Sequence, residues 1–192
     1  EWNNFIDGFG VNEEHSTFGA IFSPHNTFRF TFDALYNFTL NRSKKWVSSI
    51  NMQTGWLSNK NVDSFFHFYS GGLPGMLGYT FYDEELTGSR KIIITSKNRI
   101  PIFLERNIII GNLNLQNMSL GWIMQVGGAF NDDLINFITE NSYKFSTGLE
   151  LRLHGFSFYS YPTAVEYGYH IPIANNEEIS FGKHYLSVLF GF

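Results

Sequence analysis

The stretch Tyr143-Lys144-Phe145-Ser146-Thr147-Gly148-Leu149-Glu150-Leu151-Arg152-Leu153-His154 decides the fold, because it alternates between two kinds of side chain. One set of alternate positions is largely apolar: Tyr143, Phe145, Thr147, Leu149, Leu151 and Leu153. The other set is polar or small: Lys144, Ser146, Gly148, Glu150, Arg152 and His154. Successive side chains of a β-strand point to opposite faces, whereas a helix repeats every three or four residues. The stretch therefore predicts a strand with one face suited to lipid and the other to water.

The same alternation recurs in residues 27–40, where Phe28, Phe30 and Phe32 alternate with Arg29, Thr31 and Asp33, and in residues 163–171. These runs reach about ten residues or more, whereas strands of soluble proteins are usually about 5–6 residues long. A strand that crosses a bilayer at a tilt needs about 9–11 residues. The length of the runs therefore favours a transmembrane β-barrel.

The composition agrees with this interpretation and excludes several other classes. The 192 residues include 21 Phe, 10 Tyr and 4 Trp but only 16% charged residues, which excludes a disordered chain. No stretch approaches the roughly 20 apolar residues of a membrane-spanning helix. A net charge of −4 argues against a nucleic-acid partner, and the absence of cysteine excludes disulfides and thiolate metal sites.

A pass along the chain predicts an all-β, antiparallel transmembrane barrel in a single domain, residues 1–192. The expected strands are Phe18–Ser23, Phe28–Asn41, Trp46–Leu57, Asp63–Tyr69, Lys91–Phe103, Met118–Asn131, Tyr143–Phe158, Thr163–Ile173 and Lys183–Phe192. Turn-favouring residues such as Asn41-Arg42-Ser43-Lys44 separate them. The run Trp2–Gly10 is ambiguous, and Asn131–Ser142 is expected to form a short helix or a long loop.

A glycine-rich segment interrupts the strands between Ser70 and Arg90. It contains Gly71-Gly72 and, further on, Leu77-Gly78-Tyr79. This segment resembles the inward-folded loop of the bacterial surface antigen superfamily, which includes BamA-type assembly factors, TamA-like proteins and two-partner secretion transporters. In that family a glycine pair precedes an Arg-Gly-Tyr or Arg-Gly-Phe tip that folds into the barrel lumen.

Further elements follow in the order of that family. Phe130-Asn131-Asp132 resembles its Phe-x-Asp element, and the segment around Gly148 and Glu150 resembles its penultimate, glycine-containing region. The resemblance implies that Phe130, Asp132, Gly148 and Glu150 form the wall that contacts the loop. The sequence departs from the family at the loop tip, where Leu77 replaces the arginine that would pair with Asp132, so the loop must be held differently.

The end of the chain resembles the terminal strand signal of bacterial outer-membrane barrels, which assembly machinery reads. Leu186, Val188, Phe190 and Phe192 share one face of the expected last strand. Nine or ten strands fit into this length, whereas a typical family barrel has sixteen. We therefore expect the C-terminal 8–10 strands of a larger barrel, although an even number of strands could also close alone.

The resemblance implies a protein of the bacterial outer membrane that serves membrane-protein assembly or polypeptide translocation. Its partners would be outer-membrane lipid, the barrel assembly machinery during biogenesis, and a polypeptide client or accessory subunits. The alternative is a barrel that anchors an upstream periplasmic or surface domain, which the loss of arginine at Leu77 favours. We predict no enzyme activity, cofactor or metal site, and give low weight to a lipid-modifying enzyme using His154 with Ser157 or Ser160.

Overall fold

The computed structural model describes residues 2–3, 6–12, 17–22, 27–60, 62–158, 161–173 and 181–191, with side chains from residue 27 onward. Within these residues the chain is an all-β, antiparallel protein. Eight strands follow one another in a single sheet in the order β1 (Trp2–Asn3), β4 (Thr27–Asn41), β5 (Trp46–Leu57), β8 (Arg90–Phe103), β10 (Leu113–Phe130), β11 (Lys144–Ser157), β12 (Tyr161–Ile173) and β13 (Lys183–Phe190).

The remaining elements are short. β9 (Ile108–Ile110) pairs with β10 at one end of the sheet. β2 (Ile6–Asn12) and β3 (Thr17–Phe22) form a separate hairpin, and β6 (Phe68–Tyr69) pairs with β7 (Thr87–Gly88). The helices are η1 (Ser64–Phe66), η2 (Glu84–Leu86) and α1 (Leu134–Thr139). No helix in the described part of the chain is long and apolar enough to cross a bilayer.

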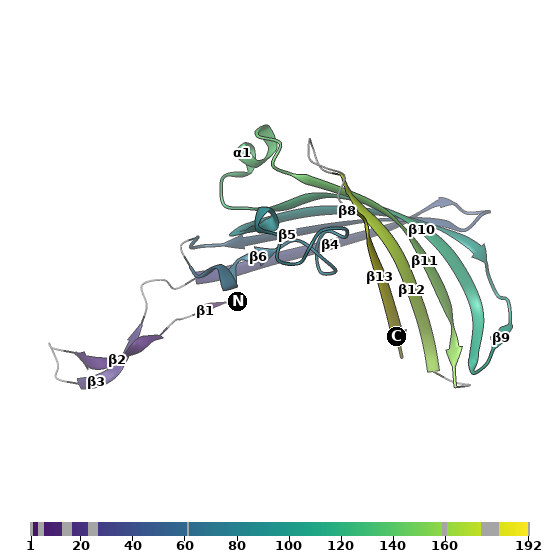
Figure 1. The fold of residues 1–192 in the computed structure, drawn as a ribbon, viewed down its shortest axis with the longest axis horizontal. Helices are drawn as coiled ribbons and strands as arrows, with labels where there is room; N and C mark the ends of the chain where they lie inside the picture. Colours follow the sequence, from purple (N-terminus) through teal and green to yellow (C-terminus); the bar gives the residue numbers. More distant parts are fainter. Residues whose placement is uncertain are drawn as a thin grey trace.

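The sheet curves into an arch with a convex and a concave side (Figure 1). In the described residues it is open, because β1 and β4 form one edge, β13 forms the other, and no pairing joins them. The connections of residues 58–89 and 131–143 leave the sheet at the same end, since consecutive strands are antiparallel neighbours. The four-residue connection 42–45 and the end of β11 at Ser157 lie at the opposite end.

The predicted alternation of faces is confirmed on β11, β12 and β13. Cross-strand pairs such as Trp122 with Leu149 and Leu149 with Tyr169 run across the convex face. The pair of Arg152 with Glu166 lies on the concave face with the other polar residues. Because the side chains of paired residues point to the same side of a sheet, most large apolar side chains of the long strands share the convex face, and Ile93 and Ile123 are exceptions on the concave face.

The buried apolar core lies on the concave side, between the sheet and the long connection that follows β5. One cluster contains Leu57, Val62, Phe68 and Ala129, and a second contains Met76, Leu86 and Ile93. The chain itself therefore covers part of the concave face, whereas most large apolar side chains of the convex face stay exposed.

Two expected strands, Asp63–Tyr69 and Met118–Asn131, differ in the structure, and two open expectations are decided. Asp63–Tyr69 is not one strand, because the Asp63 carboxylate accepts a hydrogen bond from the Phe65 amide and starts η1. The segment Asn131–Ser142 contains the short helix α1. The ambiguous run Trp2–Gly10 contains β1 and part of β2, and β10 begins five residues earlier than predicted, at Leu113.

Strand β10 contains a glycine that the sheet requires. Gly127 has a φ of +143°, and an added Cβ would lie 2.0 Å from the carbonyl oxygen of Ile92 on the neighbouring strand β8. An L-amino acid with a side chain rarely adopts this φ, and the contact is with backbone that cannot rotate away. Gly127 therefore allows β8 and β10 to approach closely at the loop-rich end.

We predict that Gly127→Ala lowers the free energy of unfolding by about 2–3 kcal/mol, because backbone strain adds to the clash with Ile92. Gly111→Ala is the matched control, since Gly111 also has a positive φ, +58°, but no atom lies within 4 Å of an added Cβ. The control is expected to cost only about 1 kcal/mol. Urea unfolding followed by tryptophan fluorescence measures both, and equal losses would contradict the argument.

Candidate functional site

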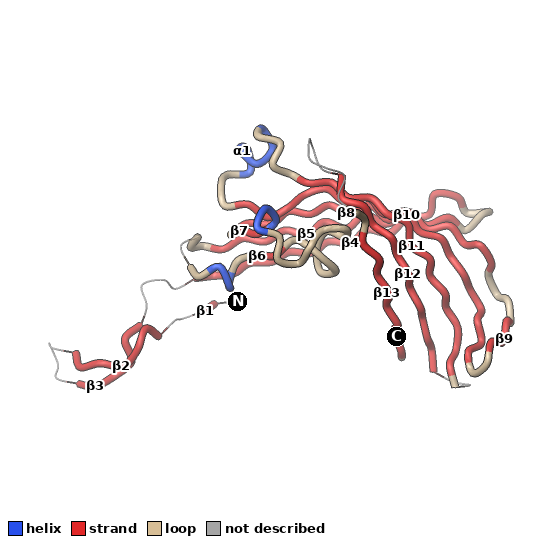
Figure 2. The backbone as a smooth tube through the Cα atoms, viewed as in Figure 1, coloured by secondary structure: helices blue, strands red, loops and turns tan. Residues whose placement is uncertain are grey.

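The segment from Ser70 to Leu86, called the inner loop, folds back onto the concave face of the sheet (Figure 2). Met76 and Leu86 are fully buried and pack against Ile93 of β8. The Ser70 amide donates to the carbonyl of Leu86, and the Met76 amide donates to the carbonyl of Ser70. The inner loop is therefore a compact unit that is held by hydrogen bonds within itself and packs on the concave face of the sheet.

Glycines allow the loop to fold this tightly. An added Cβ at Gly71 would lie 1.9 Å from the Thr80 carbonyl oxygen, and one at Gly75 would lie 2.2 Å from that of Ser70. Gly72 has a φ of +71°, which glycine adopts without cost. The predicted glycine pair Gly71-Gly72 therefore has a structural reason: a side chain at either position would open the loop.

Gln125 of β10 is the main polar contact between wall and loop. Its Oε1 accepts from the Leu77 amide at 2.7 Å, and its Nε2 donates to the Gly75 carbonyl at 3.0 Å. The Ser146 hydroxyl also donates to Oε1, and Nε2 also donates to Thr95 Oγ1. The Gln125 amide therefore provides hydrogen-bond partners for two backbone groups of the loop tip and for the side chains of Thr95 and Ser146.

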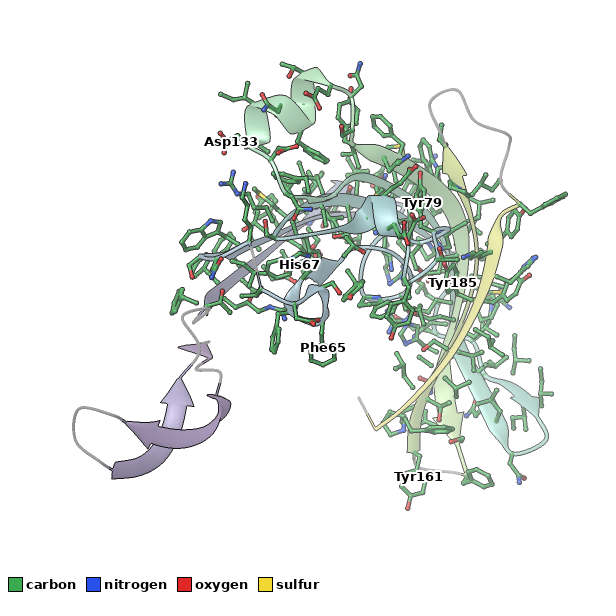
Figure 3. All side chains as sticks on the ribbon, turned by 60° about the vertical axis from the view of Figure 1, so that its left-hand side comes forward. Phe65, His67, Tyr79, Asp133, Tyr161 and Tyr185 are labelled. Atoms are coloured by element: carbon green, nitrogen blue, oxygen red, sulfur yellow. The ribbon has the colours of Figure 1, made fainter. Side chains whose placement is uncertain are left out.

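The next two residues of the tip reach other strands. The Gly78 amide donates to the Tyr185 hydroxyl of β13 at 2.8 Å, and the Tyr79 hydroxyl donates to the Phe145 carbonyl of β11 at 2.7 Å. Figure 3 shows Tyr79 and Tyr185 on the concave side. Burial, together with the charges of Asp83 and Glu85, raises the pKa of the Tyr79 hydroxyl to about 12. The hydroxyl therefore stays protonated and can donate this hydrogen bond.

Gly78 also touches the wall directly. Its φ is +97°, and an added Cβ would lie 3.1 Å from the Pro172 nitrogen of β12. The loop tip therefore contacts β10, β11, β12 and β13, and it spans the half of the sheet that ends at the β13 edge.

Leu77 points into a cavity of about 220 Å³ rather than toward an aspartate. The cavity is lined by Leu73, Leu77, Lys97, Glu150, Glu166, Gly168, His170, Tyr185 and Ser187. Glu150 of the predicted wall therefore lines the same cavity as Leu77 of the loop tip.

The predicted contact between the loop tip and Asp132 is not observed. The Leu77 amide is hydrogen-bonded to Gln125 of β10. Asp132 lies beyond Phe130, where β10 ends, and Phe130 is about 17 Å along the strand from Gln125 at 3.3 Å per residue. Asp132 is exposed, and its backbone carbonyl accepts from Arg90. Phe130 contacts a different part of the chain, since Gly88 lies directly against its backbone.

The concave face also contains a network of charges around Glu150. Lys97 Nζ lies 2.8 Å from Glu150 Oε2, and Arg99 binds Glu150 Oε1. Arg99 lies 3.8 Å from Glu166, which also pairs with Arg152 at 2.7 Å. The network extends across β8, β11 and β12, and each carboxylate has at least one cation.

His170 is the most deeply buried titratable side chain of this wall, with 2% of its surface exposed. Its ring lies against Gly148, where an added Cβ would come within 2.2 Å of Nδ1, and against Gly168. Tyr185 packs edge-on at 5.6 Å between ring centroids. The predicted wall residue Gly148 therefore makes space for His170 rather than for the loop.

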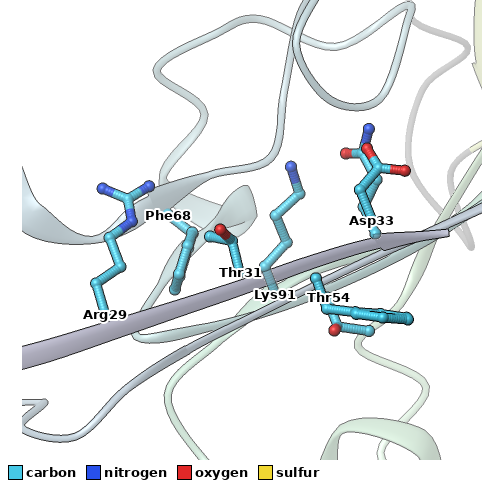
Figure 4. Close-up of a pocket in the computed structure, with 8 residues that line it drawn as sticks. Arg29, Thr31, Asp33, Thr54, Phe68 and Lys91 are labelled. Atoms are coloured by element: carbon cyan, nitrogen blue, oxygen red, sulfur yellow. The ribbon is translucent and has the colours of Figure 1, made fainter. Parts of the chain in front are cut away.

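A second concave cavity, of about 320 Å³, lies toward the β4 edge and is lined by Arg29, Thr31, Phe32, Asp33, Gln53, Thr54, Phe68 and Lys91 (Figure 4). Gly55 leaves room for the Phe68 ring, and the Arg29 guanidinium stacks 4.4 Å from that ring's centroid. Asp33 accepts a hydrogen bond from Asn51 at 2.7 Å.

The last strand behaves as predicted where it is described. Leu186, Val188 and Phe190 are all exposed on the convex face, opposite Tyr185 and Ser187. Phe192, the final position of the predicted terminal strand signal, lies outside the described residues. β13 forms a free edge of the sheet within the described chain.

The Ser157 hydroxyl, one of the side chains considered for catalysis, shares a 2.6 Å hydrogen bond with the Thr163 hydroxyl. Ser160 lies outside the described residues. Among the residues that the structure describes, no group of three His, Asp or Glu side chains is placed to hold a metal ion.

Sequence reasoning missed Gln125 and Tyr185 as loop-binding residues. Gln125 stands out as a polar side chain in the apolar run Ile123-Met124-Gln125-Val126, and Tyr185 faces opposite to Leu186. Neither signal says what the side chain meets, because the loop lies 48 and 107 residues away along the chain.

No protein-family model, curated protein or solved structure matches this chain. The resemblance to the surface antigen superfamily therefore stays a prediction.

We predict that Gln125→Leu loosens the inner loop, because it leaves the Leu77 amide and the Gly75 carbonyl without a partner. Each unsatisfied buried group costs about 1–3 kcal/mol. Hydrogen exchange of residues 70–80 should accelerate, while the β8 and β10 amides stay protected. The control is Gln53→Leu on the same face, which contacts no loop backbone; equal acceleration in both variants would contradict the assignment.

We predict that in the variant Leu77→Arg the introduced guanidinium pairs with Glu150 and not with Asp132. A double-mutant cycle with Glu150→Gln should give a coupling energy of about 0.5–3 kcal/mol, whereas a cycle with Asp132→Asn should give none. Chemical unfolding of the four variants in each cycle measures the coupling. Coupling to Asp132 alone would restore the contact predicted from the resemblance.

Proposed function

We propose that the chain forms part of the wall of a β-barrel in a bacterial outer membrane, and that this barrel serves membrane-protein assembly or polypeptide translocation. The observation that supports the proposal is the contrast between the two faces of one curved sheet. The convex face is apolar and uncovered, and the concave face is polar and holds an inward-folded loop.

The convex face exposes large apolar side chains on every long strand. Phe30 of β4 is 51% exposed, Trp122 of β10 is 49% exposed and Leu186 of β13 is 70% exposed, and the strands between them follow the same pattern. Soluble proteins rarely expose a continuous apolar patch of more than a few hundred Å². A lipid environment would remove this surface from water.

The strands are also long enough for a bilayer. β4, β5, β8, β10, β11 and β12 have between 12 and 18 residues, whereas a tilted transmembrane strand needs about 9–11. In outer-membrane barrels the longer connections face the outside of the cell. By that rule the end with residues 58–89 and 131–143 is the outer one.

The polar concave face supports a lumen. Its carboxylates Glu150 and Glu166 are paired with cations, and its buried Gln125 makes bonds to both wall and loop. Such a surface suits water and an extended polypeptide better than it suits lipid. Within the described residues β13 pairs only with β12, and a strand edge of this kind can accept a further strand, which supports the assembly role.

The second candidate is an outer-membrane anchor for an upstream periplasmic or surface domain, without insertase activity. The observation that favours it is the neutral attachment of the inner loop. Leu77 stands where the resembled family has arginine, and Gln125 and Tyr185 hold the loop tip by hydrogen bonds to its backbone. Neither hydrogen bond involves a charged side chain, so the loop tip offers no ion pair that a polypeptide client could replace.

The membrane position is tested with single cysteines, which the cysteine-free chain makes simple. After reconstitution in phosphatidylcholine vesicles and bimane labelling, brominated acyl chains should quench the label at Met52→Cys and Leu149→Cys on the convex face. The matched positions Asn51→Cys and Arg152→Cys on the concave face should stay unquenched. Equal quenching on both faces, or none on the convex face, would refute the barrel.

The same vesicles separate the two candidate functions. Vesicles that contain the protein should fold a test outer-membrane barrel several-fold faster than protein-free vesicles, as read by heat-modifiable gel migration. An unchanged folding rate together with correct convex quenching would favour the anchor.

A further inference from the structure

Helix α1 lies over the convex side of the sheet, opposite to the inner loop (Figure 1). A chain of aromatic contacts fixes it there. Phe137 stacks on Phe130 with ring centroids 4.2 Å apart, Tyr143 packs edge-on against Phe137, and Phe145 continues the series at 5.3 Å from Tyr143. The helix is therefore held at the loop-rich rim by aromatic rings, of which Phe137 is buried.

Between α1 and the sheet lies an apolar groove of about 350 Å³, called the α1 groove. This volume is at the lower end of the range for small-molecule sites, about 300–1,000 Å³. Its lining comes from α1, β8, β10 and β11 and consists of Ile92, Ile94, Val126, Gly127, Leu134, Phe137, Ile138, Tyr143 and Phe145.

The floor of the α1 groove is kept open by backbone geometry. Gly127 has a positive φ and lies against the Ile92 carbonyl, so residue 127 has no space for a side chain. The walls include Ile138, which is 55% exposed, and Ile94, which is 40% exposed. These side chains line a preformed hollow and are left uncovered by the described chain.

Polar groups gather at one end of the α1 groove. Arg90, two residues before Ile92 on the same face, donates to the Asp133 carboxylate at 2.8 Å and to the Asp132 carbonyl at 3.1 Å. Asp133 lies at this rim, beside α1 (Figure 3). The Arg90 side chain is still 35% exposed, so it retains donors toward solvent.

We propose that the α1 groove binds an acyl chain of an anionic membrane lipid, with the phosphate of the headgroup near Arg90. The proposal rests on the proposed function, because the convex face meets lipid only if the chain is a membrane barrel. The groove is continuous with the exposed apolar band of β8, β10 and β11, and the arginine is at the membrane rim, where a phosphate would lie.

A hydrocarbon chain fits this surface better than a peptide segment does. The lining offers apolar side chains from paired strands, whose backbone groups are already bonded within the sheet. The Tyr143 hydroxyl is bonded to Asn141 at 3.0 Å. A peptide would bring amides into the groove without partners, which is costly in an apolar site.

The proposal is tested by native mass spectrometry of the protein extracted from vesicles of phosphatidylglycerol and phosphatidylcholine. The unmodified chain should retain one phosphatidylglycerol after detergent has removed the other lipids. Ile94→Trp fills the α1 groove and should reduce the retained fraction roughly tenfold. Ile50→Trp, also exposed on the convex face but outside the groove, should retain the lipid like the unmodified chain.

A second pair of variants covers the case in which Ile94→Trp fails to fold. Ile138→Asn places an amide in the α1 groove, and Ile135→Asn changes a 73% exposed position of the same helix that does not line it. Only the first should lose the lipid. Arg90→Gln should abolish the preference for phosphatidylglycerol over phosphatidylcholine.

The outcomes separate this proposal from the proposed function. If the convex label at Leu149→Cys is quenched by brominated lipid but all variants retain lipid equally, the α1 groove proposal is overturned and the barrel stands. Retention of a second copy of the chain or of another polypeptide in place of lipid would also overturn it. If the convex labels are not quenched, the barrel fails and the proposal fails with it.

Discussion

The rest of the structure depends on the two-residue period of the strands. Because each long strand puts its apolar residues on one side, joining the strands in register produces a sheet with an apolar convex face and a polar concave face. A shift of one residue in the pairing of β11 with β10 would bring Glu150 and Arg152 to the apolar side. The ion pairs of Glu150 with Lys97 and Arg99 require this register, since they join β8 and β11 across β10.

The connection after β5 gives the concave side of the sheet its two buried apolar clusters. Met76 and Leu86 of the inner loop pack on Ile93, and Phe68, just before the loop, packs on Leu57 and Ala129. Most large side chains of the convex face remain exposed, and Phe137 of α1 is buried at its rim. Loop and wall therefore stabilise each other, and the loop tip reaches as far as β13 through the bond from Gly78 to Tyr185.

Much of the wall could be predicted from local pattern alone. The alternation at Tyr143–His154, at Thr163–Ile171 and in Leu186, Val188 and Phe190 gave the strands and their faces. The loop contacts could not be predicted in the same way. Asp132 was expected to face the loop tip on the basis of resemblance, but Gln125, seven residues earlier, occupies that place. Asp63–Tyr69 reads as a strand because it is aromatic, yet the Asp63 cap turns it into η1.

The sequence by itself determined the all-β class of the fold and, on β11, β12 and β13, the face on which the side chains lie, because these follow from a period of two that needs no distant partner. Only the tertiary structure decided that Gln125 and Tyr185 bind the loop, that Gly148 accommodates His170, and that α1 leaves a groove over Gly127. These contacts join residues far apart in the chain, and their geometry depends on the curvature of the whole sheet, which no local pattern encodes.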